Sequence, residues 1–162
     1  MSYMLLIVEP SGQRAERGAE EGHRVYQRML DYAQTLKSRG VPAGGPVMSY
    51  MLLIVEPTGQ RRERSVDEGQ RLYQRMLDYA QTLQSRGVLL GVNSLRSEAA
   101  RLELRDGSKR IVDGPFAEAK EFVGGYFLLD CADREQALRY ATECPAAEWA
   151  TIEVREVGPC YE

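Results

Sequence analysis

The sequence predicts an α+β fold, a ferredoxin-like sandwich with an additional N-terminal strand–helix unit. Strand and helix patterns follow one another as strand–helix, several strands and helix–strand. A turn signal, Asp106-Gly107, marks an antiparallel hairpin in the middle of this order. Residues 1–41 repeat residues 48–88 without a gap, and 33 of the 41 pairs are identical. Helices separated by antiparallel hairpins favour a sheet with both helices on one face.

The complete domain begins with a short apolar run, Tyr50–Val55, closed by Glu56-Pro57. A run that is apolar on both sides is typical of a central strand. A charged loop follows, and then Ser65 and Glu68 have the spacing of a capping box, which predicts the start of a helix. Gly87 follows the last apolar turn of that helix, and glycine is common at the position just after a helix end.

The rest of the domain is predicted to hold five strands and a second helix. The strands are expected at Val88–Leu90, Ala99–Arg105, Lys109–Val112, Gly125–Asp130 and Trp149–Val157. Asp133 is placed to cap a helix over Arg134–Glu143, which Pro145 stops. The second face of such a sheet stays open, and a second subunit often covers it. We therefore expect a homodimer or a higher oligomer.

The repeat divides the chain into a strand–helix unit over residues 1–41, a Pro/Gly linker over 42–47 and a complete domain over 48–162. The first copy keeps the apolar strand Tyr3–Val8, which is a poor edge strand in water. This copy can take the native position, fill it in another chain as a domain swap, or add beside the complete sheet. Gly18 replaces Ser65 and removes the capping box, so we expect the second copy to hold the native position. A natural and an engineered origin, the latter to study folding or swapping, both stay open.

Composition narrows the classes of function. The chain is 43% hydrophobic and 28% charged with a net charge of −3, as in ordinary soluble globular proteins. No basic stripe predicts a nucleic-acid partner, and no apolar run is long enough to span a membrane. The cysteines have no metal-type spacing and no export signal precedes them, so we expect reduced thiols in the cytoplasm, no metal and no cofactor.

One segment identifies a family resemblance. Residues 113–121 read DGPFAEAKE, and GGYF follows at 124–127. Together with Tyr50–Leu53, Cys144-Pro145-Ala146 and Ile152–Arg155, this string resembles the YCII-related family, in the branch named for its DGPF motif. The resemblance implies a dimeric α/β barrel, in which two ferredoxin-like sheets face each other and enclose clefts. The molecular function of the family is mostly unknown. Some relatives resemble small enzymes that act on cyclic or chlorinated aromatic compounds through a His/Asp pair, and others are encoded beside extracytoplasmic-function sigma factors.

The chain departs from the enzymatic pattern because its single histidine, His23, lies in the first copy, where the complete domain has Gln70. We interpret His23 as a solvated helix residue. Asp113 is the candidate catalytic group, although Asp-Gly-Pro is equally a turn former. The candidate ligand-binding residues are Tyr50, Glu118, Lys120 and Tyr126.

The hypothesis is a protein that binds a small molecule in a cleft near the DGPF loop, with at most a weak lyase or isomerase activity. The alternative is an interaction module in sigma-factor-linked regulation. Arg61, Arg62 and Arg64 are interpreted as a solvated loop. Gly124-Gly125 is predicted to allow close backbone approach or a bulge.

Overall fold

The computed structural model describes residues 7, 18–38, 49–114, 116 and 119–158. The chain separates into two compact units, one with residues 1–45 and 158–162 and one with residues 46–157. Each is described by itself.

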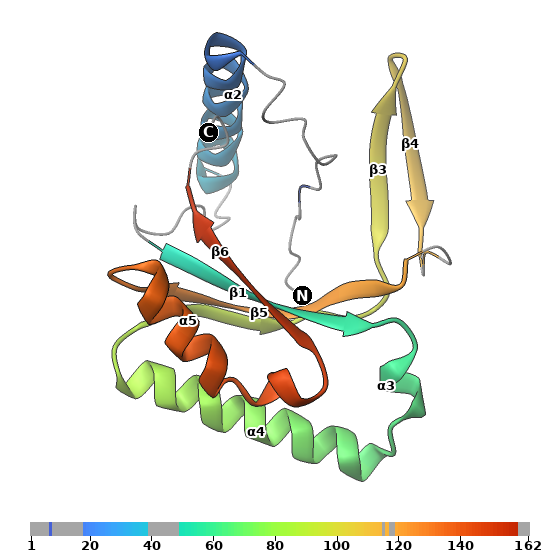
Figure 1. Cartoon of the computed structure of the whole chain (residues 1–162). Coiled ribbons are helices and arrows are strands. Elements are labelled where there is room, and N and C mark those ends of the chain that lie inside the picture. The colour runs from blue at the N-terminus through green and yellow to red at the C-terminus, as the bar shows by residue number, and fades with distance from the viewer. Residues whose placement is uncertain (1–6, 8–17, 39–48, 115, 117–118, 159–162) are drawn as a thin grey trace. The chain divides into compact units, whose positions relative to one another are not determined.

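The larger unit has the predicted ferredoxin-like arrangement. Its four-stranded antiparallel sheet has the order β2-β5-β1-β6. These strands are β1 (Ser49–Pro57), β2 (Leu89–Ser94), β5 (Glu121–Asp130) and β6 (Thr151–Val157). Helices α4 (Val66–Ser85) and α5 (Arg134–Glu143) pack on one side of the sheet (Figure 1). The apolar run of β1 is a central strand, as the sequence predicts.

The core lies between this sheet and the two helices. Leu52 of β1 and Leu83 of α4 are fully buried, and the ring of Tyr79 meets that of Phe127 edge-on at 5.1 Å between centroids. The Tyr79 hydroxyl donates to the Tyr140 carbonyl at 2.7 Å, and burial raises the pKa of this phenol above its ordinary value. The hydroxyl therefore stays protonated and joins α4 to α5.

Alternation along β1 directs a second set of apolar residues away from the helices. Met51, Leu53 and Val55 occupy these positions, and Tyr126 and Leu128 lie opposite Leu53 and Met51 in β5. The dimer expected on this face stays a prediction.

The predicted helix ends are confirmed. The Ser65 side chain accepts from the Glu68 amide at 3.2 Å, and Asp133 accepts from the Gln136 amide at 2.7 Å. Gly87, with φ +72°, donates to the Gln84 carbonyl, and the next amide reaches Leu83, which is a Schellman ending. The capping box is only half formed, because the Glu68 side chain makes no bond back to Ser65.

Several elements differ from their predicted bounds, and β2 for example continues to Ser94. β5 begins at Glu121 rather than Gly125, because β1 continues to Pro57 and supplies a partner for it. Gln60–Glu63 forms a short helix, α3, inside the predicted charged loop. A 3₁₀ turn, η1 (Pro145–Glu148), precedes β6, which consequently starts at Thr151 rather than Trp149.

Strands β3 (Ala100–Arg105) and β4 (Ser108–Asp113) form a separate two-stranded sheet between β2 and β5 in the chain. Asp106 and Gly107 have φ of 50° and 74°, the positive angles of a type I′ turn. The predicted hairpin is confirmed, and it is an insertion into the ferredoxin-like order.

In the smaller unit, α2 (Ala19–Ser38) spans the residues that correspond to α4 in the repeat. His23 is exposed on this helix. The predicted strand at Tyr3–Val8, except Ile7, and the linker at 42–47 lie outside the described residues. Where the first copy packs stays a prediction.

We expect the chain without residues 1–47 to fold on its own, because the core cluster, among the residues that the structure describes, lies between Tyr50 and Val154. Deletion should change the free energy of unfolding by less than about 1 kcal/mol, measured by circular dichroism in urea. Leu83→Ala in the same truncated chain should lower it by about 2–5 kcal/mol. A truncated chain that unfolds without a cooperative transition would contradict the prediction.

Candidate functional site

A buried carboxylate marks one end of the sheet. Glu56, near the end of β1, is 3% exposed. It lies on the face of β1 that carries Leu52 and Ile54 into the core. Arg61 of α3 donates to it through Nε at 3.0 Å and through Nη2 at 2.5 Å. This two-bond geometry is the strongest that an arginine and a carboxylate form, and it compensates the charge of the buried carboxylate.

Arg61 also ties together chain segments that are distant in sequence. Its Nη1 donates to the Leu95 carbonyl just after β2 at 2.6 Å, and its Nη2 donates to the Gly124 carbonyl in β5 at 2.8 Å. The guanidinium carbon lies 5.1 Å from the centroid of the Phe122 ring. One side chain therefore links α3 to β1, β5 and the segment that leaves β2.

Gly124 makes room for this ion pair. A Cβ at that position would lie 2.0 Å from Glu56 Oε1 and 2.6 Å from Arg61 Nη2. The register between β1 and β5 shifts at the same place, between Ile54 and Val55. The sequence-based prediction of close approach or a bulge at Gly124-Gly125 is confirmed, and its cause is a buried side-chain pair.

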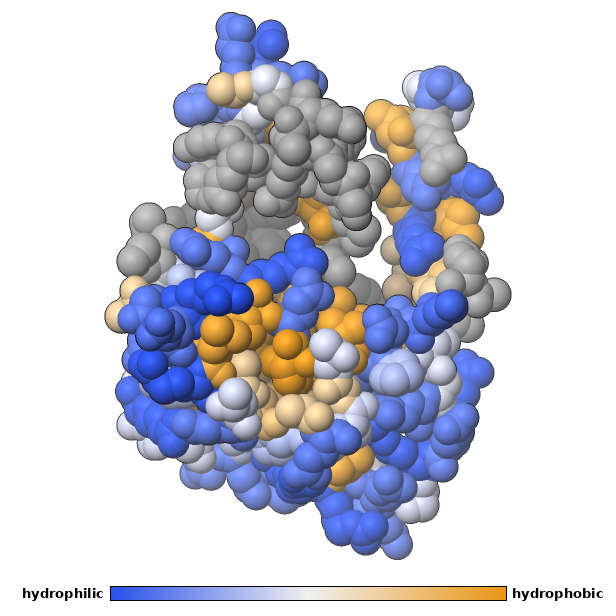
Figure 2. All heavy atoms as spheres, in the orientation of Figure 1, coloured by the Kyte–Doolittle hydropathy of each residue, from blue (hydrophilic) through white to orange (hydrophobic). Residues whose placement is uncertain are grey.

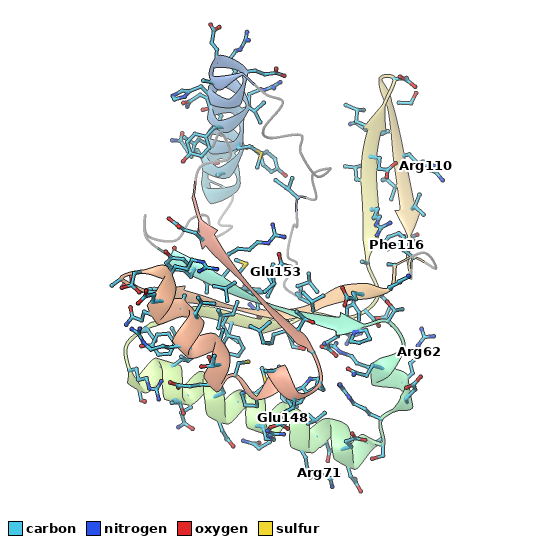
Figure 3. All side chains as sticks on the ribbon, in the orientation of Figure 1. Arg62, Arg71, Arg110, Phe116, Glu148 and Glu153 are labelled. Carbon is cyan, nitrogen blue, oxygen red and sulfur yellow. The ribbon has the colours of Figure 1, made fainter. Side chains whose placement is uncertain are left out.

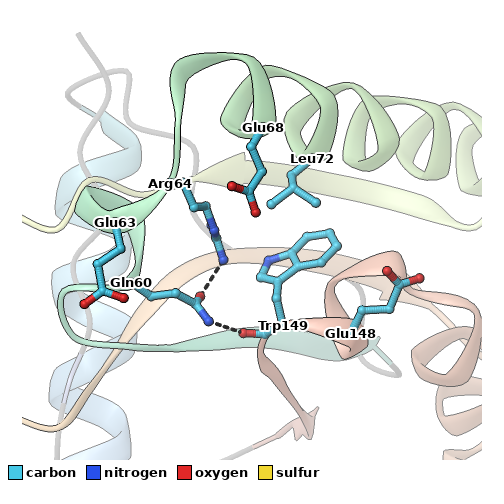
Figure 4. Close-up of a pocket in the computed structure, with 7 residues that line it drawn as sticks. All are labelled: Gln60, Glu63, Arg64, Glu68, Leu72, Glu148 and Trp149. Carbon is cyan, nitrogen blue, oxygen red and sulfur yellow. Dashed lines mark hydrogen bonds between the residues drawn. The ribbon is translucent and has the colours of Figure 1, made fainter.

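Arg64 extends the cluster toward the surface. Its Nη1 lies 3.6 Å from Glu56 Oε2, and its Nη2 donates to Gln60 Oε1 at 2.5 Å. Gln60 in turn donates to the Trp149 carbonyl at 3.0 Å (Figure 4). The Arg64 guanidinium lies 5.9 Å from the centroid of the Trp149 ring. Arg64 is thus held in place from two sides.

Beside Arg64 lies an open pocket of about 390 Å³. Its lining residues come from α3, α4 and the η1–β6 segment: Gln60, Glu63, Arg64, Glu68, Leu72, Glu148 and Trp149. In Figure 4 the Glu68 carboxylate points toward the Arg64 guanidinium and the Trp149 indole. Neither this carboxylate nor the indole N–H makes a hydrogen bond or ion pair with any residue that the structure describes.

The far wall of the pocket is an ion pair on the surface. Arg75 donates to both oxygens of Glu148, at 2.8 and 2.5 Å, and its guanidinium lies 5.4 Å from the centroid of the Trp149 ring. These hydrogen bonds lower the pKa of Glu148 below its ordinary value. Glu148 is therefore engaged, whereas Glu68 is available to a ligand.

The DGPF loop lies at the same end of the sheet. Thr58 holds it to the end of β1, because the Thr58 amide donates to the Lys120 carbonyl at 2.9 Å and its hydroxyl to the Ala119 carbonyl at 2.7 Å. Asp113 is the exposed last residue of β4, and the side chain of Lys120 is also exposed. Glu118 lies outside the described residues.

The two predicted tyrosines lie on opposite faces of the sheet. Tyr50 packs in the core, with its hydroxyl 3.4 Å from Glu156, and burial followed by that carboxylate raises the pKa of Tyr50. The Tyr126 hydroxyl accepts from the Asn93 amide at 3.0 Å. None of the predicted site residues that the structure describes lines the pocket beside Arg64.

The interpretation of the three arginines as a solvated loop is wrong for two of them. The side chains of Arg61 and Arg64 are only 33% and 14% exposed, whereas Arg62 is exposed on the surface of α3 (Figure 3). A signal for this was present in the sequence, because Glu56 continues the core-facing alternation of β1. A carboxylate at such a position requires a nearby cation.

The described residues offer no cluster of three or more metal-ligating side chains and no helix long and apolar enough to cross a membrane. Burial raises the pKa of the Cys144 thiol to about 11 and raises that of Cys131 as well. Both thiols are therefore protonated, and of low reactivity, at neutral pH.

Two comparisons with known proteins bear on this site. Residues 48–160 match the family of the YCII-related domain. An uncharacterized protein of Rhizobium meliloti (strain 1021) is 40% identical over 62 residues, which are 37% of this chain and 50% of the relative. The chain thus spans about half the length of that curated relative.

We predict that Gly124→Ala destabilises the domain by about 3 kcal/mol, because the methyl group displaces a buried ion pair. Gly69→Ala is the matched control. A Cβ at Gly69 meets nothing within 4 Å, so this change inside α4 should stabilise the domain by about 0.5–1 kcal/mol. Urea unfolding of both variants measures the difference, and equal midpoints would contradict the geometry.

Arg61→Ala should lower the free energy of unfolding by about 3 kcal/mol, because the buried Glu56 carboxylate loses both hydrogen bonds from Arg61 and keeps only the Arg64 guanidinium at 3.6 Å. Arg62→Ala removes the same charge from the next, exposed position and should change stability by less than about 0.5 kcal/mol. Thermal and urea unfolding of the two variants side by side test this. A loss at Arg62 that equals the loss at Arg61 would show that only net charge matters.

Proposed function

The chain belongs to the YCII-related domain family, and we propose that it binds a small molecule in the pocket beside Arg64. The observation that carries the proposal is a pair of polar groups without partners among the described residues. The Glu68 carboxylate and the Trp149 indole N–H both face this pocket. Arg64, already positioned by Glu56 and Gln60, stands next to them. Because Arg64 is already held in place, it can bind a ligand without first having to be ordered.

The chemistry of the lining indicates a ligand with two different ends. The Arg64 guanidinium and the Trp149 N–H are donors, and they suit a carboxylate or another acceptor. Glu68 is an acceptor, and it suits an ammonium group or another donor. The side chain of Leu72 and the indole ring offer apolar surface between them. A small zwitterion with an apolar side chain, such as an amino acid, combines these features.

The size of the pocket is consistent with this class. Its volume of about 390 Å³ lies at the lower end of the range of roughly 300–1,000 Å³ found for small-molecule sites.

Residues 48–162 contain no histidine, the usual proton carrier near neutral pH. We therefore propose that the protein binds its ligand without lyase or isomerase activity.

Within the family, the string at 113–116 supports a place in the branch named for its DGPF motif. The loop that follows this string contacts Thr58, two residues before Gln60 of the pocket wall. This link supports a role for the loop in positioning α3, rather than in contacting the ligand.

Trp149 is the only tryptophan of the chain and lines the pocket, so its fluorescence reports on binding. We expect a saturable change on titration with leucine, and a much smaller one with 4-methylpentanoate or 3-methylbutylamine. These two probes each lack one of the charged groups of leucine. Glu68→Gln should weaken leucine binding about tenfold, which is the typical loss when a charge-assisted hydrogen bond is removed.

Asp67→Asn is the matched control, because it makes the same chemical change on the neighbouring residue in the first turn of α4, outside the pocket lining. It should leave the titration unchanged. A Trp149 signal that responds to none of the three probes, or that responds equally in the Glu68 and Asp67 variants, would refute the proposal.

A further inference from the structure

The hairpin β3–β4 has one apolar and one charged face. Its cross-strand pairs alternate between the two faces, and Leu102 lies opposite Ile111. Leu102, Leu104 and Ile111 share one face and are 66%, 68% and 70% exposed. Figure 2 shows apolar residues at the surface of this hairpin.

The charged residues gather on the opposite face of the hairpin, so its apolar residues are not scattered at random over a solvated arm. It carries Arg101, Glu103 and Arg110, and the labelled side chain of Arg110 points outward in Figure 3. Segregation of apolar and charged residues to opposite faces is the pattern of a sheet with one face covered. A two-stranded sheet exposed on both faces is only marginally stable in water.

The two ends of the apolar face carry opposite charges. Lys109 lies on this face beside the turn, opposite Leu104, and Asp113 lies on it at the base, opposite Ala100. Lys109 and Asp113 are four positions apart on β4, about 13 Å, so their side chains cannot form an ion pair within one hairpin. Neither side chain makes an ion pair or hydrogen bond with the residues that the structure describes.

We propose that this face binds the same face of a second copy of the chain, with the two hairpins antiparallel. A twofold axis that runs across the strands places Lys109 of each copy against Asp113 of the other. It also places Leu102 against its own counterpart, and the large Leu104 against the small Ala100. The face is thus complementary to itself in both charge and volume. No other occupant is required to explain the position of Asp113.

The area of the apolar hairpin face limits how tightly two copies can associate through it. Strands of six residues span about 20 Å by 10 Å, which is well below the roughly 800 Å² per partner of a standard interface. The association through the hairpins alone is therefore weak, with a dissociation constant in the micromolar range, on the order of 100 µM. It strengthens any dimer that forms through another surface.

A charge swap tests the register. Sedimentation velocity on the full chain, at about 5–500 µM and low salt, gives the dissociation constant of each variant. Lys109→Asp and Asp113→Lys should each weaken association about tenfold, because both place like charges together at two symmetric positions. The double variant restores opposite charges and should regain the wild-type constant. Leu102→Asp should remove the contribution of the hairpins and weaken association at least as much as either single charge change.

Lys109→Gln and Arg110→Gln form the matched control pair, because they remove the same charge from adjacent residues on opposite faces. Only Lys109→Gln should weaken association. Circular dichroism checks that each variant is folded. The proposal is overturned if the wild-type chain is monomeric at 500 µM, if Leu102→Asp leaves assembly unchanged, or if the double variant stays as weak as the single ones. Insensitivity to Leu102→Asp would leave the face for a different protein partner.

Discussion

The arrangement of this domain depends on one buried ion pair. Glu56 lies where the sheet meets α3, and Arg61 donates two hydrogen bonds to it and two more to backbone carbonyls. Because those carbonyls belong to β5 and to the segment after β2, a local pair between residues five positions apart fixes long-range geometry. It also explains why position 124 has no room for a Cβ atom, and why Arg64, directly after α3, lies beside the pocket. The pocket is a consequence of how the end of the sheet is closed.

Much of the fold could be predicted because its signals are local. Ser65, Asp133 and Gly87 act within one helical turn, and Asp106-Gly107 defines its own hairpin. The site could not be predicted in the same way. Trp149 and Arg64 are brought together only when β6 pairs with β1, and sequence spacing carries no trace of that contact. The resemblance to a family directed attention to the DGPF segment, while the unpaired polar groups lie one element away.

The charged loop after β1 shows where the reasoning from patterns was too coarse. Three arginines within four residues look alike in a sequence, yet one is exposed and two are engaged. What separates them is the backbone at this point: the short helix α3 directs Arg61 toward the Glu56 carboxylate and Arg62 toward solvent, and the extended residue that ends α3 places Arg64 beside the same carboxylate. An acidic residue at a core-facing position at the end of an apolar strand predicts a nearby cation, because a buried carboxylate is costly without one.

The position of β1 at the centre of the sheet gives the repeat a kinetic meaning. β1 pairs with β6 across about a hundred residues of chain, as in Ser49 with Val157, so its native contacts form late and over a large loop. Residues 1–10 are identical in sequence to residues 48–57, so two segments of the same sequence compete for β5 and β6 during folding. The sequence of these ten residues therefore cannot decide which copy pairs with β5 and β6. The loop to β6 is longer for the first copy, but this raises the cost of loop closure by only about 0.3 kcal/mol, so the helix cap at Ser65, which is Gly18 in the first copy, also favours the second.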